Sequence, residues 1–422
     1  MPEKGTPRTR RRTWLVAALA VTLLAASSVT WFAVARAEER EDRLDANREL
    51  VAQGCAGLLR EEMYASVPDD ARGVLDAYGT LLRPGQESRA LLDCTLAWGG
   101  GGGAEVDVQA RVRAEAVPDR TSPGSVTGDF GLPLPAGATG SVGTADRWGG
   151  GAVATAALLV DCPAGLRGRG RTTRDLLVSV DLPSHADDAD VNGVPKAERL
   201  AVARTAAKVT NWVSRKEGCG SDPLRTEPGA APAKAPELCA WLSPKGLGST
   251  PGEWSYGGND RTYNRRAGAC GGRWDDTAGS PGHLTVQAAD ARSWSGVLAA
   301  GAYEEYADKA LVPDPKAPAA HDEPLTVERS GDDRRLALWA RSECVAGPTY
   351  HRVSVTPAFD FDFDYGHEDG KVVLEPKDQR RLSRHVRTVL DRYLSAPDGW
   401  PKRSHCRGTK IVGEVAEWRG RD

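Results

Sequence analysis

The longest unbroken apolar stretch of the chain runs from Trp14 to Ala35 and contains no charged residue. At about 1.5 Å of rise per residue, a helix of this length crosses a hydrocarbon core of roughly 30 Å. Five basic residues precede it, Lys4, Arg8, Arg10, Arg11 and Arg12. Because basic flanks stay on the cytoplasmic side, we predict a cytoplasmic tail over 1–13 and a transmembrane anchor over 14–35. The bulk of the chain is then extracytoplasmic, at the plasma membrane.

Two alternatives to an uncleaved anchor fit the same stretch. Ala35-Arg36-Ala37 has the small-x-small form of a cleavage site, although the apolar core of a signal peptide usually has only about 7 to 15 residues. Arg11 and Arg12 resemble a twin-arginine export signal, which a plain basic region explains equally well. No cysteine follows the run closely, so we expect no lipoprotein anchor.

Beyond the anchor, the hydrophobic pattern predicts strands and helices in alternation with charged segments. Residues 36–54 are dense in charge and predict a juxtamembrane helix, in which Glu39 and Arg43 form an i,i+4 pair. Some segments alternate apolar and polar residues, which predicts antiparallel strands with one buried face. These are 106–114, 176–182 and the segment that begins at Leu336. Two segments have apolar residues at helical spacing after a proline, Pro195–Val213 and 376–394.

This pattern occurs twice along the chain, in register with the cysteines. The cysteines form two sets, Cys55, Cys94, Cys162 and Cys219, then Cys239, Cys270, Cys344 and Cys406. The gaps are 39, 68 and 57 residues in the first set and 31, 74 and 62 in the second. In each set Val-Gln-Ala follows the second cysteine, Val-Ser-Val follows the third, and a helical run opened by Pro-Lys precedes the fourth. An internal duplication is the simplest explanation.

Each copy predicts a helix near its first cysteine, three or more antiparallel strands and a closing helix. That is an α+β fold with helices packed on an antiparallel sheet. We therefore expect two tandem, related domains behind the anchor. The division is a first repeat over 55–222, a linker rich in Pro, Ala and Gly over 223–236, a second repeat over 237–408 and a tail over 409–422.

Eight cysteines outside the membrane point to disulfides in an oxidising compartment. No C-x-x-C spacing favours zinc, and eight buried free thiols are the alternative. Four cysteines allow three pairings in each repeat, among which the sequence does not choose. We expect the first to pair with the second and the third with the fourth, because these bonds would join each end helix to the sheet.

Composition and charge exclude one class of function. The formal net charge of −3 and the pI near 6.2 argue against a nucleic-acid-binding protein, which normally has a strongly basic surface. A single isoleucine, Ile411, among abundant Ala, Arg, Gly and Asp suggests a high-GC genome. No H-E-x-x-H or G-x-S-x-G motif is present, so no catalytic residue is predicted and an enzyme stays an open question. We expect the seven scattered histidines on the surface.

One cluster has the donor pattern of a calcium loop. Asp188, Asp190 and Asn192, followed by Gly193, match D-x-D-x-N-G, in which alternate oxygens converge on one ion. The full loop needs a bidentate Glu at its twelfth position, where Arg199 stands. The alternative is a solvated turn. Calcium is the one cofactor that the sequence suggests.

The second repeat resembles a known type of domain at Leu238–Leu242, with Cys270, Trp274 and the segment Leu284–Val286. It looks like the small domains of actinobacterial envelope lipoproteins of unknown function and, more distantly, the extracellular sensor domain of membrane Ser/Thr kinases. Through the duplication, the resemblance extends to the first repeat. It implies an α+β sheet stapled by two disulfides, with a ligand-binding cleft. This chain departs from those families because it has no lipoprotein cysteine and no cytoplasmic kinase.

Together these features predict a membrane-anchored, extracytoplasmic binding or interaction protein with an unknown ligand or envelope partner. The alternatives are a cell-wall enzyme with an unrecognised active site and an accessory subunit of another membrane protein. An acidic pair in a cleft would favour the enzyme, and a pocket lined by apolar and neutral side chains would favour binding. Seven tryptophans could line a sugar or peptide groove or fill core and interface positions: Trp98, Trp148, Trp241, Trp254, Trp274, Trp294 and Trp339.

Overall fold

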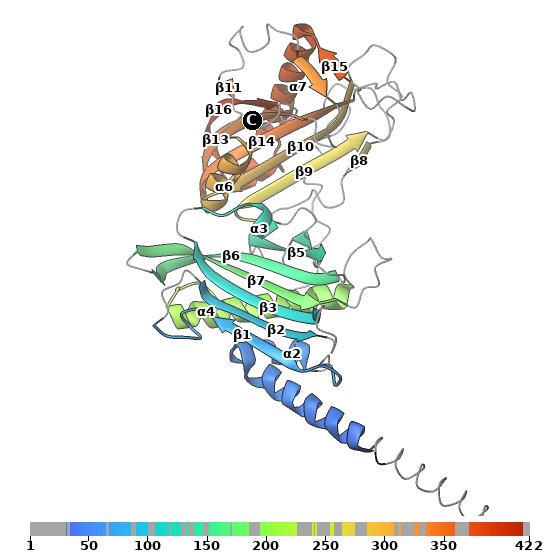
Figure 1. Ribbon diagram of the computed structural model, residues 1–422. Coiled ribbons are helices and arrows are strands. Elements are labelled where there is room, and N and C mark those ends of the chain that lie inside the picture. Colours follow the sequence, from blue (N-terminus) through green and yellow to red (C-terminus); the bar gives the residue numbers. More distant parts are fainter. Residues whose placement is uncertain are drawn as a thin grey trace, which may run out of the picture. The chain divides into compact units, whose positions relative to one another are not determined.

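The computed structural model describes residues 31, 34–64, 67–85, 90–99, 106–117, 120–127, 132–133, 139–146, 152–168, 171–184, 195–225, 239, 241–242, 254–256, 264–274, 285–307, 312–313, 325–328, 335–358 and 371–416 (Figure 1). The chain divides into two compact units, Met1–Ala77 with Cys94–Ala110 and Tyr78–Asp93 with Arg111–Asp422. The predicted anchor over 14–35 lies almost wholly outside the described residues. Within them, no helix combines the length and the apolar character needed to cross a membrane.

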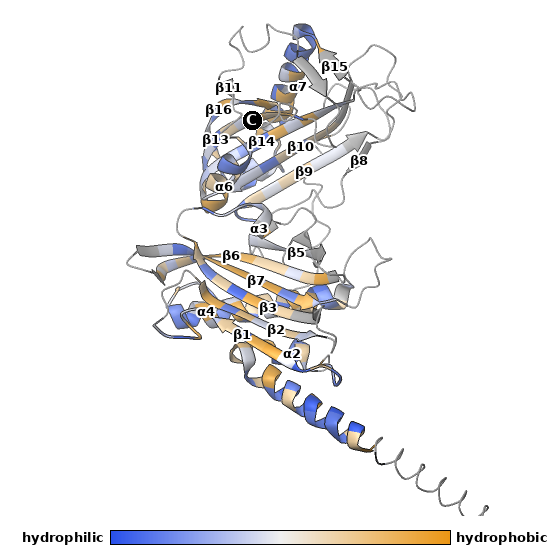
Figure 2. Cartoon of the chain, viewed as in Figure 1, coloured by the Kyte–Doolittle hydropathy of each residue, from blue (hydrophilic) through white to orange (hydrophobic). Residues whose placement is uncertain are grey.

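The first unit begins, in its described part, with a helix over 34–53, where the charge pattern predicts one. It is followed by η1 (Gly54–Gly57), α2 (Arg60–Met63) and β1 (Gly73–Tyr78). The helix is largely hydrophilic (Figure 2), and Arg43 pairs with Glu39 as predicted. The buried Asn47 ties it to the loop before β1: its Nδ2 donates to the carbonyl of Ala71 at 2.7 Å, and its Oδ1 accepts from the N–H of Gly73 at 2.8 Å.

Two large antiparallel sheets and four disulfides make this an α+β protein, as predicted. In the described residues, the first sheet has the strand order β1-β2-β3-β7-β6-β5-β4. Its further strands are β2 (Ala90–Gly99), β3 (Val106–Val117), β4 (Leu132–Pro133), β5 (Thr139–Asp146), β6 (Ala152–Gly168) and β7 (Arg171–Pro183). The alternating segments 106–114 and 176–182 lie in β3 and β7, which confirms both strand predictions. Two helices accompany this sheet, α3 (Gly124–Thr127) and α4 (Lys196–Glu217), of which α4 packs on β6 and β7.

The second sheet has the order β11-β16-β13-β14-β10-β9-β8. Its strands are β8 (Trp254–Tyr256), β9 (Ala267–Trp274), β10 (Thr285–Ser295), β11 (Val312–Pro313), β13 (Leu336–Cys344), β14 (Gly347–Ala358) and β16 (Arg407–Ala416). Its helices are α6 (Val297–Tyr306), α7 (Pro376–Ser395) and α8 (Trp400–Arg403). Strands β12 (Leu325–Glu328) and β15 (Lys371–Leu374) form a separate pair.

The two sheets share their strand order over five positions. The series β1-β2-β3-β7-β6 corresponds to β8-β9-β10-β14-β13. The sequence matches follow the same order: β3 and β10 carry the Val-Gln-Ala segments, and β7 and β14 carry the Val-Ser-Val segments. The sixth position differs, because β5 fills it in the first sheet and β16 in the second. The segment after Gly408, which has no strong sequence pattern, therefore forms part of a sheet.

The two closing helices follow from local sequence signals. Pro195 stands at the N-cap of α4, and Gly218 ends it with a left-handed φ of 68°, which favours glycine. Helix α7 has Pro376 in its first turn. A row of apolar residues three or four apart faces β13 and β14 from α7; it contains Leu382, Val386, Val389, Leu390 and Tyr393. Both helices were predicted from this spacing.

The disulfides join Cys55 to Cys94, Cys162 to Cys219, Cys239 to Cys270 and Cys344 to Cys406. No cysteine is free. This is the pairing expected from the sequence, first with second and third with fourth in each set. The third-to-fourth bonds connect β6 to the end of α4 and β13 to the start of β16, so each fixes a closing segment to a sheet.

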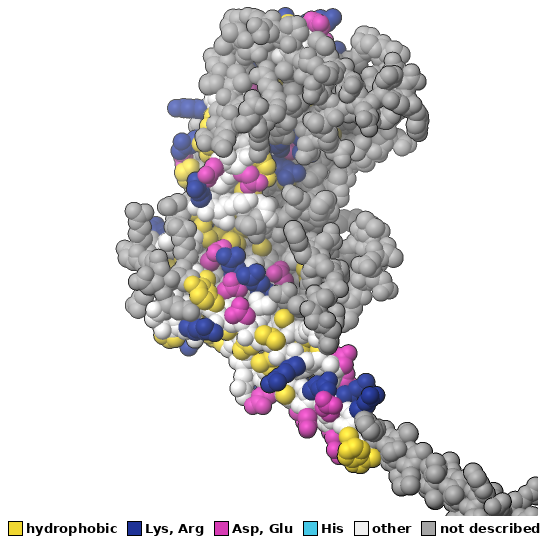
Figure 3. All heavy atoms as spheres, in the orientation of Figure 1, with side chains coloured by type: hydrophobic (Ala, Val, Ile, Leu, Met, Phe, Trp, Pro, Cys, Tyr) yellow, Lys and Arg dark blue, Asp and Glu magenta, His cyan; other side chains and the backbone are white. Residues whose placement is uncertain are grey.

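Charged side chains of both signs are intermingled on the face in Figure 3. On β2 and β3, Asp93 pairs with Arg111 at 2.8 Å, and Arg113 pairs with Glu115 at 3.1 Å. These side chains are partly exposed, so each pair is expected to contribute only up to about 1 kcal/mol.

The expectation that all histidines lie on the surface is wrong for His351. This β14 residue is fully buried. Its Nδ1 shares a hydrogen bond of 2.7 Å with the hydroxyl of Ser293, and its Nε2 shares one of 2.9 Å with Ser342. The Ser293 hydroxyl also contacts Tyr393 Oη at 2.7 Å. Burial lowers the pKa of His351 to about 3, so the ring is neutral at physiological pH. Two serines on neighbouring strands satisfy it inside the core.

Candidate functional site

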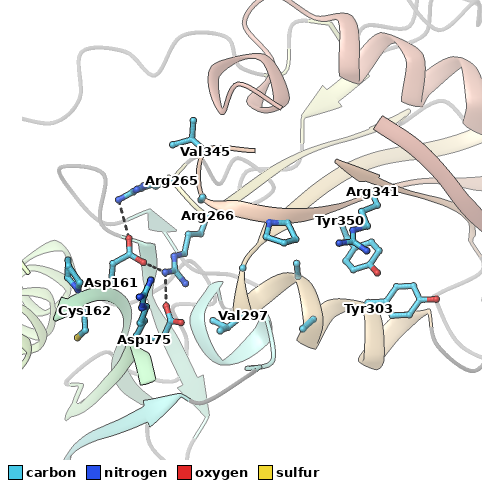
Figure 4. Close-up of a pocket in the computed structure, with 17 residues that line it drawn as sticks. Asp161, Cys162, Asp175, Arg265, Arg266, Val297, Tyr303, Arg341, Val345 and Tyr350 are labelled. Atoms are coloured by element: carbon cyan, nitrogen blue, oxygen red, sulfur yellow. Dashed lines mark hydrogen bonds and ion pairs between the residues drawn. The ribbon is translucent and has the colours of Figure 1, made fainter. Parts of the chain in front are cut away.

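A pocket of about 820 Å³ lies beside α6, entirely within the second unit. We call it the α6 pocket; seventeen residues line it (Figure 4). They are Asp161, Cys162, Pro163, Arg174, Asp175, Arg265, Arg266, Gly296, Val297, Ala299, Ala300, Tyr303, Arg341, Val345, Ala346, Pro348 and Tyr350. Figure 4 shows a charged end, where Arg265 and Arg266 face two aspartates, and an aromatic end with Tyr303 and Tyr350.

The charged end is organised around Arg266. Its Nη2 forms an ion pair with Asp175 Oδ1 at 2.6 Å and a second ion pair with Asp161. Arg265 Nη1 also approaches Asp161 Oδ2, at 3.1 Å. The two aspartates come from β6 and β7, and the two arginines from the segment that enters β9. Each aspartate is thus neutralised by an arginine that is about one hundred residues away in the sequence.

Burial shifts the acid–base behaviour of this pair. It raises the pKa of Asp175 to about 6 and lowers the pKa of Arg266 to about 10. The guanidinium therefore stays charged at neutral pH, and burial makes the Asp175 carboxyl easier to protonate than an exposed aspartate. Arg266 is the residue on which the charge balance of this end depends.

Local hydrogen bonds fix the backbone of Arg266. The side-chain Oδ1 of Asn264 accepts from the N–H groups of Arg266 at 2.9 Å and Ala267 at 2.7 Å, as Asn often does in a turn. The carbonyl of Arg266 accepts from the N–H of Ser295 at 2.8 Å. Asn264 in turn offers its own carbonyl to Trp400 Nε1 at 2.8 Å. The arginine is held by contacts that do not involve its charge.

The apolar wall of the pocket is the first part of α6. Behind it lies a hydrophobic cluster that joins Leu298 and Ala302 of α6 to residues of both sheets. The helix approaches the segment before α3 closely, since a Cβ on Gly301 would lie only 1.9 Å from the carbonyl oxygen of Thr121. The N–H of Thr121 donates to the carbonyl of Val297 at 3.2 Å. This packing gives the pocket a firm wall.

The aromatic end is also built on packed rings. Tyr303 and Tyr350 stack with their centroids 4.7 Å apart, and the edge of Trp339 contacts both at 6.2 Å. Trp98, Trp294 and Trp339 are buried. These three side chains therefore fill cores and do not line a groove, and Trp241 packs partly buried against the core of the second sheet. Arg341, the cross-strand partner of Tyr350, is exposed at this end of the pocket.

The residues singled out from the sequence lie elsewhere. Asp188, Asp190 and Asn192 are outside the described residues, so the calcium loop stays a prediction. In the described part of the chain, Cys344, His351 and Cys406 are a group that could hold a metal ion by proximity alone. The two cysteines are joined in a disulfide and both ring nitrogens of His351 have serine partners. This group is therefore not suited to bind a metal.

Sequence reasoning missed the charged residues of the α6 pocket. Asp161 and Asp175 interrupt the apolar runs of β6 and β7, and Arg266 immediately precedes β9. A charged residue within or beside a long apolar strand was the one sequence feature that could have indicated this site. That feature does not reveal which distant residue will neutralise the charge.

Comparison with known proteins gives no relative for this chain. No family model matches it, and no curated protein or solved structure matches it either. The resemblance to actinobacterial envelope and sensor domains accordingly stays an expectation.

Proposed function

We propose that this chain is a membrane-anchored, extracytoplasmic binding protein of a bacterial cell envelope, with a small-molecule ligand in the α6 pocket. The observation that carries the proposal is the pocket itself. Its volume of about 820 Å³ lies within the range of roughly 300–1,000 Å³ typical of small-molecule sites. Its lining combines the apolar wall of α6 with six charged side chains.

The proposed compartment and the proposed membrane anchor are supported by different parts of the chain. Disulfides that engage all eight cysteines are expected to persist only in an oxidising compartment. The apolar run Trp14–Ala35 behind basic residues supports a single-pass anchor with a cytoplasmic N-terminus. Carbonate extraction of membranes tests the tether: release of the chain into the soluble fraction would argue for a cleaved signal peptide.

The tandem, related domains of this proposal are supported by the shared strand order and by the matched disulfides. In both halves the second cysteine lies in the strand next to the Val-Gln-Ala strand, and the fourth follows the closing helix. Duplication of one domain accounts for both correspondences.

A cell-wall hydrolase is a second candidate, because Asp161 and Asp175 form an acidic pair in the pocket. A carboxyl with a raised pKa, such as that of Asp175, is also a common feature of a general acid. Arg266, however, lies between the two aspartates and forms ion pairs with both. A carboxylate held by a guanidinium is poorly placed to transfer a proton to a substrate, so we favour binding over catalysis.

The binding proposal is tested by filling the pocket. Ala300 lines it from an exposed position on α6, so Ala300→Trp should block it without disturbing the core. We expect members of a library of anionic, neutral and cationic small molecules to raise the Tm of the full chain and to lose this effect with Ala300→Trp. Thr388→Trp, at an exposed position of α7, is the matched control. Equal responses of Ala300→Trp and the unmodified chain, or no response at all, would reject binding at this pocket.

A further inference from the structure

The N-terminus of α6 opens onto the pocket without a capping side chain. Gly296 is its N-cap, with φ 62° and ψ −131°, a conformation that favours glycine. The N–H of Gly296 donates to the carbonyl of Pro348 at 2.9 Å. The N–H groups of Val297 and Leu298 lie in the first turn, where no intrahelical carbonyl can accept them. No acidic residue lies in that turn, so the positive end of the helix dipole has no anionic neighbour of its own.

A second and independent feature is one nitrogen of Arg266. The Arg266 side chain is 9 % exposed. Its Nη2 contacts the two aspartates, and its buried Nη1 has no hydrogen-bond partner among the residues that the structure describes. Nη1 lies 3.5 Å from the point where a Cβ on Gly296 would stand. A buried donor without an acceptor is costly, and native proteins usually satisfy it with water or a ligand. Here it is directly beside the uncapped helix end.

We propose that these donors form an oxyanion site, at which Arg266 Nη1 and the first-turn N–H groups of α6 bind a carboxylate or phosphate group of the ligand. The inference rests on the proposed function and deepens it, since it names the ligand class as an organic anion. Helix N-termini bind anionic groups well because their N–H groups converge on them. A charge-assisted bond from a guanidinium adds to that preference.

The rest of the pocket indicates what the anionic group is attached to. From Gly296 the wall continues along Ala299 and Ala300 towards the stacked Tyr303 and Tyr350. These surfaces suit an apolar or aromatic body. The ligand class is therefore an amphipathic organic anion, with its charged group at the Arg266 end and its body along α6.

The charge balance of the lining favours the same class. Asp161 and Asp175 are neutralised by Arg265 and Arg266, as described above. Arg174 and Arg341 also line the pocket and have no carboxylate of the lining beside them in the described residues; the Glu343 partner of Arg341 lies outside the pocket. An anion approaching the pocket is thus attracted by two further guanidinium groups, and a cation is repelled.

The test compares four probes on the full chain by isothermal titration. They are 3-phenylpropionate, phenyl phosphate, the neutral 3-phenyl-1-propanol and inorganic phosphate. We expect at least one aromatic anion to bind about tenfold or more tightly than the neutral alcohol, because hydrogen bonds to a charged group are strong. The two aromatic anions distinguish a carboxylate from a phosphate ligand. Inorganic phosphate should bind more weakly than phenyl phosphate, because it lacks the apolar body.

The site itself is tested by Val297→Pro, which removes one first-turn N–H while proline is well tolerated at this helix position. Val297→Ala is the matched control, since it trims the side chain and keeps the N–H. We expect Val297→Pro to weaken the aromatic anion about fivefold or more relative to Val297→Ala, with no change for the alcohol. If Val297→Pro does not fold, Arg266→Lys serves the same purpose, because it keeps the charge and removes Nη1.

The outcomes separate this inference from the proposed function. Equal affinities for the alcohol and the aromatic anions, or equal effects of Val297→Pro and Val297→Ala, would overturn the oxyanion site while leaving a binding pocket. Loss of all probe binding in Ala300→Trp but not in Thr388→Trp would locate the probes in the α6 pocket. If no probe binds, the oxyanion site is rejected; the library screen against Ala300→Trp then decides the proposed function independently.

Discussion

The two large sheets have the same order over five strands but obtain their sixth strand from different places in the sequence. In the first sheet β5 pairs with β6, which follows it directly in the chain. In the second sheet β16, the last described strand, pairs with β13 instead. The outer neighbours are β4 and β11 respectively. A fixed sheet position can therefore be filled by the adjacent strand of a local hairpin or by a strand that is distant in the sequence.

This difference changes what the fourth cysteine of each set does. In the described residues no strand of the first sheet follows Cys219, so the bond to Cys162 fixes the end of α4 to β6. After Cys406 the chain turns directly into β16, so the bond to Cys344 also fixes the start of a sheet strand. The closing segment of the second half is thus held by pairing, by packing and by a covalent bond.

The largest effect that the comparison predicts is the loss of β16. Truncation after Gly408 removes the buried Val415 and Glu414, whose carboxylate accepts from Ser383 at 2.7 Å. It also leaves β13 paired on one side only, with β14. We expect a loss of at least about 5 kcal/mol, comparable to the stability of a whole domain, measured by urea unfolding. Truncation after Ala416, which keeps β16, is the control; equal stability of the two would show that β16 contributes little.

The next effect distinguishes the two third-to-fourth disulfides. Paired Cys→Ser substitutions at Cys162 and Cys219, or at Cys344 and Cys406, open loops of 57 and 62 residues. Chain entropy predicts about 4 kcal/mol of lost stability in each case. The location should differ, because only the second pair leads into a sheet strand. Hydrogen exchange should speed up along Arg407–Ala416 for the second pair and only around the end of α4 for the first. If both variants showed the same pattern of faster hydrogen exchange, the two disulfides would not differ in the segments that they fix.

Features of the fold that depend on residues close together in the sequence could be predicted, and features that join distant residues could not. Strands β3 and β7 and helices α4 and α7 have periodic patterns of their own. The four cysteines of each set allow three pairings, and the correct one was expected because it joins each end helix to the sheet. Strand β16 has no such pattern because its first half is exposed and its buried end includes Glu414. The oxyanion site joins Arg266 to the start of α6, and its charge balance depends on Asp161, 104 residues from Arg265. Only the folded chain brings those residues together.

The smallest effect concerns His351, a buried residue of the second half. The Val-Ser-Val match aligns it with Leu176, which is buried in the first sheet. The pKa of His351 falls from 6.5 to about 3 on burial. Below pH 6.5 the unfolded chain binds a proton that the folded chain excludes, so this contribution to stability is complete above that pH. It is lost as the pH falls towards 3, by up to about 1.4 kcal/mol per pH unit.

We therefore expect the second half to lose roughly 2–3 kcal/mol between pH 6.5 and pH 4.5 through this residue. His351→Leu, which gives the second half the side chain of the first, should remove that part of the pH dependence. At pH 7 the same variant should be less stable than the unmodified chain, since Ser293 and Ser342 each lose one partner. Urea unfolding at both pH values measures the two effects. An unchanged acid sensitivity in His351→Leu would assign it to carboxylates and would remove His351 as a source of different acid sensitivity in the two halves.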